Sequence, residues 1–215
     1  GGAERFIELL LPGLAERQVD VSVIARKWAG EANSPMRWVA CNPFYFGSAW
    51  RDKSFAKAAC RKVVEGSYDL VQSHERLSCC DIFRAGDGVH AAWLEARQKY
   101  LGESLGWLKL NPFNRFHANS LAAEQRMFAR PRLKRVICIS NMVRQDVQRF
   151  YGLPDEKLIT IYNGIDLVYF SVDSVAKNQE VRQKLKIPTD ALVYVFVGSG
   201  FKRKGLEVAI RALPP

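Results

Sequence analysis

A glycine-rich basic loop follows an apolar run near the end of the chain. Its sequence is Gly198-Ser199-Gly200-Phe201-Lys202-Arg203-Lys204-Gly205. Glycines let a backbone approach a ligand closely, Arg203 can grip phosphate oxygens in a fork, and Lys204 adds a compact charge. The loop does not match the Walker A pattern. It predicts a phosphate-binding site that includes Gly198, Arg203 and Lys204, with a solvated basic loop as the alternative.

A second candidate for phosphate binding is Gly1-Gly2, which stands directly before a helical pattern. Backbone N–H groups at a helix N-terminus favour anions. An ordinary strand-to-helix turn is the alternative, and the strand expected before these glycines is missing from the sequence. Gly1 and Gly2 are therefore candidate substrate-binding residues.

Apolar patterning places both loops next to regular elements. Strand-like runs cover residues 19–25, 36–40, 68–73, 81–85, 135–139, 158–162 and 191–198. Helical spacing covers residues 3–17, 52–65, 89–106, 116–130, 142–151, 177–186 and 205–213. The alternation predicts a doubly wound α/β sheet, in which ligands bind beyond the carboxyl ends of the strands.

Single residues refine this pattern. Pro12 should kink or break the first helix. Ser140 is expected to cap the helix that follows it, and Gly152 to end that helix in a left-handed conformation. The run 191–198 is fully apolar, which predicts a strand buried on both faces of a parallel sheet.

Composition limits the class of protein. The chain has 215 residues, 48% of them hydrophobic, which is enough for one domain and part of another. No apolar run is long enough to span a membrane, so we expect no membrane-spanning helix. The sequence has no initiator Met and its first residues do not form a signal peptide, so we expect its ends to be cut. The net charge of +10 favours an anionic partner, with a solvated basic face as the alternative.

Five cysteines are present, an odd number, and no two of them form a C-x-x-C pair. We therefore expect neither a disulfide framework nor a zinc site, and we expect a reducing compartment. Cys138 lies in a strand-like run and should be a small buried hydrophobic residue.

Several stretches, taken in order, resemble family 4 glycosyltransferases of the GT-B fold. They are Gly1 to Glu4, VICISN at 136–141, YGLP at 151–154, IYNGID at 161–166, FVG at 196–198 and RKG at 203–205. A shorter segment, CDIFRAGDGVH at 80–90, resembles the lipopolysaccharide core branch, whose members add glucose to an inner-core heptose.

The resemblance implies two Rossmann-like domains. Residues 1–170 would form the acceptor-side domain without its first strand, 171–190 a linker, and 191–215 the start of the nucleotide-sugar domain. It also implies a nucleoside-diphosphate sugar donor such as UDP-glucose, hexose transfer with retention of configuration, and neither a metal nor a cofactor.

The resemblance also assigns roles to residues. Gly2 would face the donor, and Arg203 and Lys204 would hold its diphosphate and stabilise the charge of the leaving group. Asp87 would be catalytic or would orient the acceptor, with a simple turn aspartate as the alternative. His74, beside Glu75 and Arg76, and His90 are candidate substrate-binding residues, and a structural histidine is the alternative for each.

Core acceptors are lipid-linked, so the resemblance further implies a cytoplasmic enzyme on the anionic inner-membrane surface. Residues 93–117 mix cations with aromatic side chains and could contact that surface. A structural role for the aromatic side chains is the alternative. The paired glutamates of the family are not in this sequence, so we expect the chain alone to be inactive.

Two other functions remain open at this point. The net charge would suit a nucleic-acid-binding module, but the sequence has no RRM, KH, zinc or helix-turn-helix pattern, so we expect no nucleic-acid partner. A sugar-nucleotide epimerase of related architecture would need an acid/base set that the chain does not display.

Overall fold

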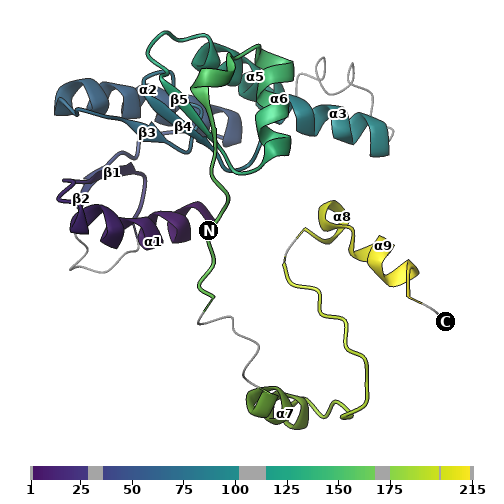
Figure 1. Cartoon of the computed structure of the whole chain (residues 1–215). Coiled ribbons are helices and arrows are strands. Elements are labelled where there is room, and N and C mark those ends of the chain that lie inside the picture. Colours follow the sequence, from purple (N-terminus) through teal and green to yellow (C-terminus); the bar gives the residue numbers. More distant parts are fainter. Residues whose placement is uncertain (1, 29–35, 102–114, 168–174, 199, 214–215) are drawn as a thin grey trace. The chain divides into compact units, whose positions relative to one another are not determined.

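A computed structural model describes residues 2–28, 36–101, 115–167, 175–198 and 200–213. The chain divides into two compact units, Gly1–Asn163 and Gly164–Pro215 (Figure 1), which are described separately below. No helix among the described residues is long and apolar enough to cross a membrane.

The first unit is built on parallel strands, as the sequence predicts. A four-stranded sheet has the order β3-β4-β5-β6, and all of its neighbouring strands are parallel. Its strands are β3 (Gln72–Ser73), β4 (Ile82–Ala85), β5 (Arg135–Cys138) and β6 (Leu158–Thr160). A separate parallel pair joins β1 (Ser22–Ala25) to β2 (Arg37–Ala40). No described strand hydrogen-bonds to both of these groups, so β1 and β2 form a sheet separate from the other four strands.

Helices join the parallel neighbours β4 and β5 and the parallel neighbours β5 and β6, whereas residues 74–81 join β3 to β4 without a helix. The described helices of this unit are α1 (Gly2–Glu16), α2 (Ser48–Gly66), α3 (His90–Leu101), α5 (Arg115–Phe128) and α6 (Asn141–Tyr151), followed by the short 3₁₀ helix η2 (Asp155–Lys157). Both caps predicted for α6 are confirmed. Ser140 Oγ accepts the Val143 N–H at 3.2 Å, and Gly152 adopts a left-handed conformation with φ of 61°.

Pro12 does not break the helix, because α1 continues through this residue, and a kink there stays a prediction. A proline removes the hydrogen bond to the carbonyl four residues earlier, here that of Glu8. Glu8 is exposed, so water can satisfy its free carbonyl and the helix need not end.

The core of the first unit lies around β5. Val136, Cys138 and Val147 are completely buried there, and Phe83 meets Phe128 edge to face at 5.8 Å between ring centroids. Buried Cys138 behaves as predicted. Because β5 hydrogen-bonds to strands on both sides and α6 packs against it, this region fixes the sheet edge at which the candidate site lies.

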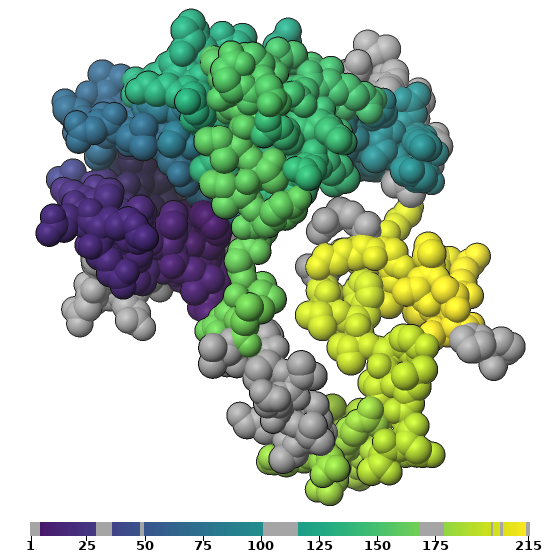
Figure 2. All heavy atoms as spheres, in the orientation of Figure 1, coloured from purple at the N-terminus to yellow at the C-terminus, as the bar shows by residue number. Residues whose placement is uncertain are grey.

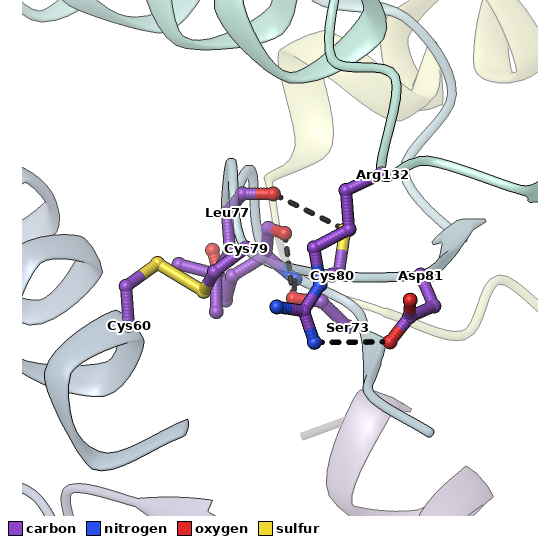
Figure 3. Close-up of a disulfide and its surroundings, with 8 residues drawn as sticks. Cys60, Ser73, Leu77, Cys79, Cys80, Asp81 and Arg132 are labelled. Carbon is purple, nitrogen blue, oxygen red and sulfur yellow. Dashed lines mark hydrogen bonds and ion pairs between the residues drawn. A yellow bond between two sulfur atoms is a disulfide. The ribbon is translucent and has the colours of Figure 1, made fainter. Parts of the chain in front are cut away.

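The expected absence of a disulfide is wrong. Cys60 of α2 is bonded to Cys79 in the segment between β3 and β4, while Cys41, Cys80 and Cys138 are free and buried (Figure 3). Nineteen residues separate the two cysteines in sequence, and only the fold brings them together. The bond also removes the cysteine-based argument for a reducing compartment.

The second unit contains α7 (Val175–Lys184), α8 (Phe201–Lys204) and α9 (Leu206–Arg211). The predicted buried strand at 191–198 is not observed. These residues form no strand, and Leu192, Val195 and Val197 are 77 to 81% exposed. An isolated extended segment has no partner for its backbone groups, and no described strand pairs with this one.

Candidate functional site

The candidate site lies where the parallel strands of the first unit end. His74 follows β3, the turn Gly86-Asp87-Gly88 follows β4, and Asn163 comes three residues after β6. The carboxyl ends of parallel strands meet at one edge of a sheet, where ligands of open α/β folds bind. We call His74, Arg84, Asp87 and Asn163, together with Phe6 of α1, the strand-end cluster.

Arg84 is the central cation of this cluster, and the sequence analysis missed it. The residue is 7% exposed, its Nη2 donates to Asn163 Oδ1 at 2.6 Å, and its guanidinium lies 3.8 Å from the centre of the Phe6 ring. Burial lowers the pKa of Arg84, and Asp87 opposes that shift. The guanidinium remains charged. Among the described residues, its direct partners are thus an amide and an aromatic ring, which leaves its charge available to an anion.

Gly86 makes room for this cation. A side chain at position 86 would place its Cβ 2.6 Å from Arg84 Nη1, which is too close for any real contact. The glycine after β4 is therefore needed for the packing of Arg84, in addition to any role in the turn.

His74 presents a neutral imidazole to the same place. Its ring lies 5.5 Å from the Phe6 ring, and its Nδ1 is buried with no hydrogen-bond partner among the described residues. Burial, and then the charge of Arg84, lower its pKa. Ser73 Oγ donates to Glu75 O at 2.7 Å and accepts the Glu75 N–H at 3.0 Å, so a local turn holds the backbone around His74. Within the described part of the chain, the Nδ1 is therefore an unpaired polar atom at the strand ends.

Asp87 lies exposed in the turn after β4. Within the described part of the chain, no hydrogen bond or ion pair holds its carboxylate. Its charge acts on Arg84 and helps to raise the pKa of Glu75, which partial desolvation and Asp52 also raise. Asp87 is thus a free carboxylate beside a buried cation, which suits a group that orients a hydroxyl.

His90, the first residue of α3, makes its contacts inside the protein. Its Nε2 lies 3.0 Å from His117 Nδ1, and its ring stacks on Trp93 at 5.4 Å. Burial, and then the charge of Arg76, lower its pKa to about 4. These contacts favour the structural alternative for His90, and its binding role stays a prediction.

A buried carboxylate, also missed in the sequence analysis, supports the loops around the cluster. Glu124 of α5 is 1% exposed and accepts three hydrogen bonds, from Arg76 Nε at 2.9 Å, from the His90 backbone N–H at 2.7 Å and from Tyr151 OH at 2.5 Å. One side chain therefore ties together the segment after β3, the start of α3 and the end of α6. A glutamate in the middle of a predicted helix gives no sign of this role.

The glycine-rich basic loop belongs to the second unit. Gly198 has a φ of 137°, and the Lys204 side chain packs so closely over it that no Cβ would fit. Lys204 itself is exposed. Gly1 and the side chain of Arg203 lie outside the described residues, and Gly2 is the first residue of α1. Joint binding of one diphosphate by Gly2, Arg203 and Lys204 stays a prediction.

Two further findings concern ligands. An open hollow of about 440 Å³ lies along α8 and α9 and contains none of the strand-end cluster. Among the described residues, no three His, Cys, Asp or Glu side chains gather as a metal site would require.

Comparison with known proteins identifies the family. The model described as Glycosyltransferase Family 4 matches residues 1–169. The chain belongs to glycosyltransferase family 4. A probable transglycosylase of Burkholderia thailandensis is 28% identical over 189 residues, which cover 82% of this chain and 46% of that protein. An uncharacterized glycosyltransferase of Methanocaldococcus jannaschii is 31% identical over 80 residues, or 37% of this chain and 20% of that protein.

A solved structure supports the fold class. The crystal structure of WaaG, a glycosyltransferase involved in lipopolysaccharide biosynthesis, matches with a TM-score of 0.79 and 21% identity, over 99% of this chain and 55% of WaaG. The likeness confirms the predicted α/β, GT-B class. The chain spans about half the length of WaaG and of the Burkholderia relative, and the domain limits at residues 170 and 190 stay predictions.

Proposed function

We propose that the protein transfers a hexose from a nucleoside-diphosphate sugar, UDP-glucose in the first instance, to a lipopolysaccharide core or similar lipid-linked glycan. Transfer would proceed with retention of configuration, on the cytoplasmic face of the inner membrane. Family membership supports the reaction class, and the likeness to WaaG agrees with this acceptor class. Family membership also favours an enzyme over a nucleic-acid-binding module.

One observation carries the proposal, which is the buried cation Arg84 at the ends of the parallel strands. Glycosyl transfer from a nucleotide sugar releases a diphosphate, so negative charge develops at the leaving group. A preorganised cation in a partly desolvated place stabilises such charge more than one in water does.

The neighbours of Arg84 fit the acceptor side of the reaction. The exposed carboxylate of Asp87 can hydrogen-bond to a sugar hydroxyl and thereby orient it toward the donor, and the buried His74 Nδ1, unpaired among the described residues, belongs to the same cluster. A reaction between two bound substrates gains most of its rate from such positioning. Asp87 is the group we assign to the acceptor hydroxyl, and His74 to its orientation.

The test uses the enzyme that contains this chain, radiolabelled UDP-glucose and a core glycan lacking its terminal glucose. We expect label in the glycan and release of UDP that depends on the acceptor. Asp87→Asn should lower kcat/KM about 10²-fold, the low end for loss of a group that acts on a reacting proton. Arg84→Met should lower it by roughly 10²- to 10³-fold, as loss of an electrostatic donor does.

The control is Asp69→Asn, which changes an exposed aspartate outside the cluster and should leave the rate unchanged. Conversion of UDP-glucose to another nucleotide sugar without acceptor would indicate the epimerase instead. Wild-type rates in both Arg84→Met and Asp87→Asn would refute the role of the cluster.

A further inference from the structure

An aromatic ridge is exposed between β2 and α2, outside the strand-end cluster. It consists of Phe44, Phe46 and Trp50, which are 80%, 82% and 48% exposed. Phe44 and Trp50 meet edge to face with ring centroids 5.7 Å apart, so they form one surface feature. Isolated exposed hydrophobic residues are common, but neighbouring exposed aromatic rings mark interaction sites.

The ridge is held from its inner side by one arginine. Arg26, which follows β1, donates from Nη1 to Asn42 Oδ1 at 3.2 Å and to Pro43 O at 3.3 Å, and from Nη2 to Arg51 O at 2.5 Å. Its guanidinium also lies 4.7 Å from the centre of the Tyr45 ring. The segment before α2 is therefore anchored to β1 and to the first turn of α2, while Phe44 and Phe46 remain in solvent.

A basic stripe continues from the ridge along α2. Lys53, Lys57 and Arg61 are exposed and follow one another at intervals of four residues, beginning three residues after Trp50, so all four lie on one helix face. The opposite face packs inward through the buried Ala59 and Val63. Figure 2 shows α2, in blue, along the surface of the first unit.

The charge of α2 is positive overall. The helix has five Lys and Arg residues against two carboxylates, those of Asp52 and Glu65. Asp52 is already engaged, because Arg51 Nε lies 3.0 Å from its Oδ1. No ion pair holds Lys53, Lys57 or Arg61 within the described part of the chain.

We propose that the aromatic ridge and the basic stripe form a docking surface for an anionic lipid bilayer. Phenylalanine and tryptophan rings are stabilised at the boundary between head groups and acyl chains, whereas lysine and arginine attract lipid phosphates. The residues of this surface differ from residues 93–117, which the sequence suggested for membrane contact and which lie in large part outside the described residues. It rests on the proposed function only for its setting, since a lipid-linked acceptor lies in that bilayer.

Sedimentation with vesicles tests the surface on the purified protein. Vesicles of phosphatidylglycerol and phosphatidylcholine in equal parts should bind it, vesicles of phosphatidylcholine alone should bind it far less, and added salt should weaken binding. Removing both lysines in Lys53→Gln with Lys57→Gln should lower the partition coefficient about 25-fold, since each cation near such a surface contributes roughly five-fold. Phe46→Ser should lower it by roughly ten-fold.

Matched variants separate the surface from charge and hydrophobicity in general. Arg126→Gln with Arg130→Gln removes two exposed cations near the end of α5, and Met142→Ser removes a 68% exposed apolar side chain from α6. Both should bind vesicles like the wild type. Equal losses in these controls, or no loss in the ridge and stripe variants, would overturn the proposal.

Two further arms distinguish other outcomes. If the ridge variants lose binding to a soluble core oligosaccharide while vesicle binding is unchanged, the surface is a glycan site and the lipid proposal is wrong. Transfer to a lipid-free acceptor should be unaffected in every ridge and stripe variant. If the wild-type enzyme binds vesicles but transfers no glucose, the proposed reaction is wrong and the proposed docking surface is still supported.

Discussion

Two apolar runs in this chain have similar residue types and opposite surroundings. Arg135–Cys138 forms β5, where Val136 and Cys138 are completely buried. Residues 191–198 are at least as apolar, yet Val195 and Val197 are 77% and 81% exposed and form no strand. The first run has β4 and β6 on its two sides, and among the described residues the second has no strand beside it. Burial therefore depends on partners as much as on the run itself.

Interactions between residues that are far apart in the sequence hold the first unit together. Glu124 joins Arg76, His90 and Tyr151, and the Cys60–Cys79 bond joins α2 to the segment after β3. In the second unit, the side-chain hydrogen bonds of Arg182 reach Pro188 and Ala191, which are only six and nine residues away. Mutations should therefore cost much more in the first unit than matched mutations in the second.

The largest difference is expected for glutamates. Glu124→Ala should lower the free energy of unfolding by about 3–5 kcal/mol, because it leaves the buried ends of Arg76 and Tyr151 and the His90 N–H without their acceptor. Glu207→Ala, which removes an exposed i,i+4 pair with Arg211, should change it by at most about 0.5 kcal/mol. Urea unfolding followed by circular dichroism measures both, and similar losses in the two variants would contradict the comparison.

A matched pair of leucines tests packing in place of charge. Leu133→Ala removes a side chain that is 0% exposed, two residues before β5, and should cost about 2–5 kcal/mol. Leu192→Ala removes one that is 79% exposed and should lie within about 0.5 kcal/mol of the wild type. If Leu192→Ala were as costly as Leu133→Ala, the second run would be buried after all, and the predicted strand at 191–198 would be restored.

The disulfide gives a difference of intermediate size. Opening the Cys60–Cys79 bond should cost the first unit about 3 kcal/mol, as expected for a closed loop of this length. Thermal unfolding with and without dithiothreitol measures the loss. A variant with Cys60→Ala and Cys79→Ala serves as the control, since it should be less stable than the oxidised protein and should not respond to the reductant. An equal response in that variant would place the effect elsewhere.

Local sequence was sufficient for much of the fold. The caps Ser140 and Gly152 could be predicted because each acts on its own end of α6. Strand β5, which precedes α6, could be predicted because an apolar run between turn residues is distinctive. Pro12 could not be placed, because its cost depends on whether water reaches the Glu8 carbonyl. The prediction of a buried strand at 191–198 was wrong because the burial of such a run depends on neighbouring strands, which local sequence does not reveal.

The candidate site was predicted only in part. The position of His74 after a strand made it a candidate, and the family resemblance made Asp87 one, while the binding and catalytic roles of both stay predictions. Arg84 was missed, although an arginine within the short apolar strand Ile82–Ala85 is a detectable sign. Glu124 could not be found, since its three partners are 27 to 48 residues away in the sequence.

The smallest effect we predict concerns Asp81, which is 5% exposed at the start of β4. Burial opposes its ionisation, but the Val71 N–H at 3.0 Å and the charges of Arg132 and Lys134 hold its pKa below the ordinary 3.8. A carboxyl group whose pKa is lowered by folding stabilises the fold above its unfolded pKa, and this contribution disappears as the pH falls through the folded pKa. Asp81→Asn should therefore lower the free energy of unfolding by about 1–3 kcal/mol at neutral pH.

The deficit of Asp81→Asn should shrink as the pH falls below 3.8, because the wild-type carboxyl then becomes protonated as well. Urea midpoints at neutral pH and in strong acid measure this change. Asp69→Asn, at an exposed position, should follow the wild type at both. A deficit in Asp81→Asn that stays constant with pH would show that the shape of the side chain matters at this position and its charge does not. The ion pairs of Asp81 with Arg132 and Lys134 would then contribute nothing to the greater stability expected for the first unit.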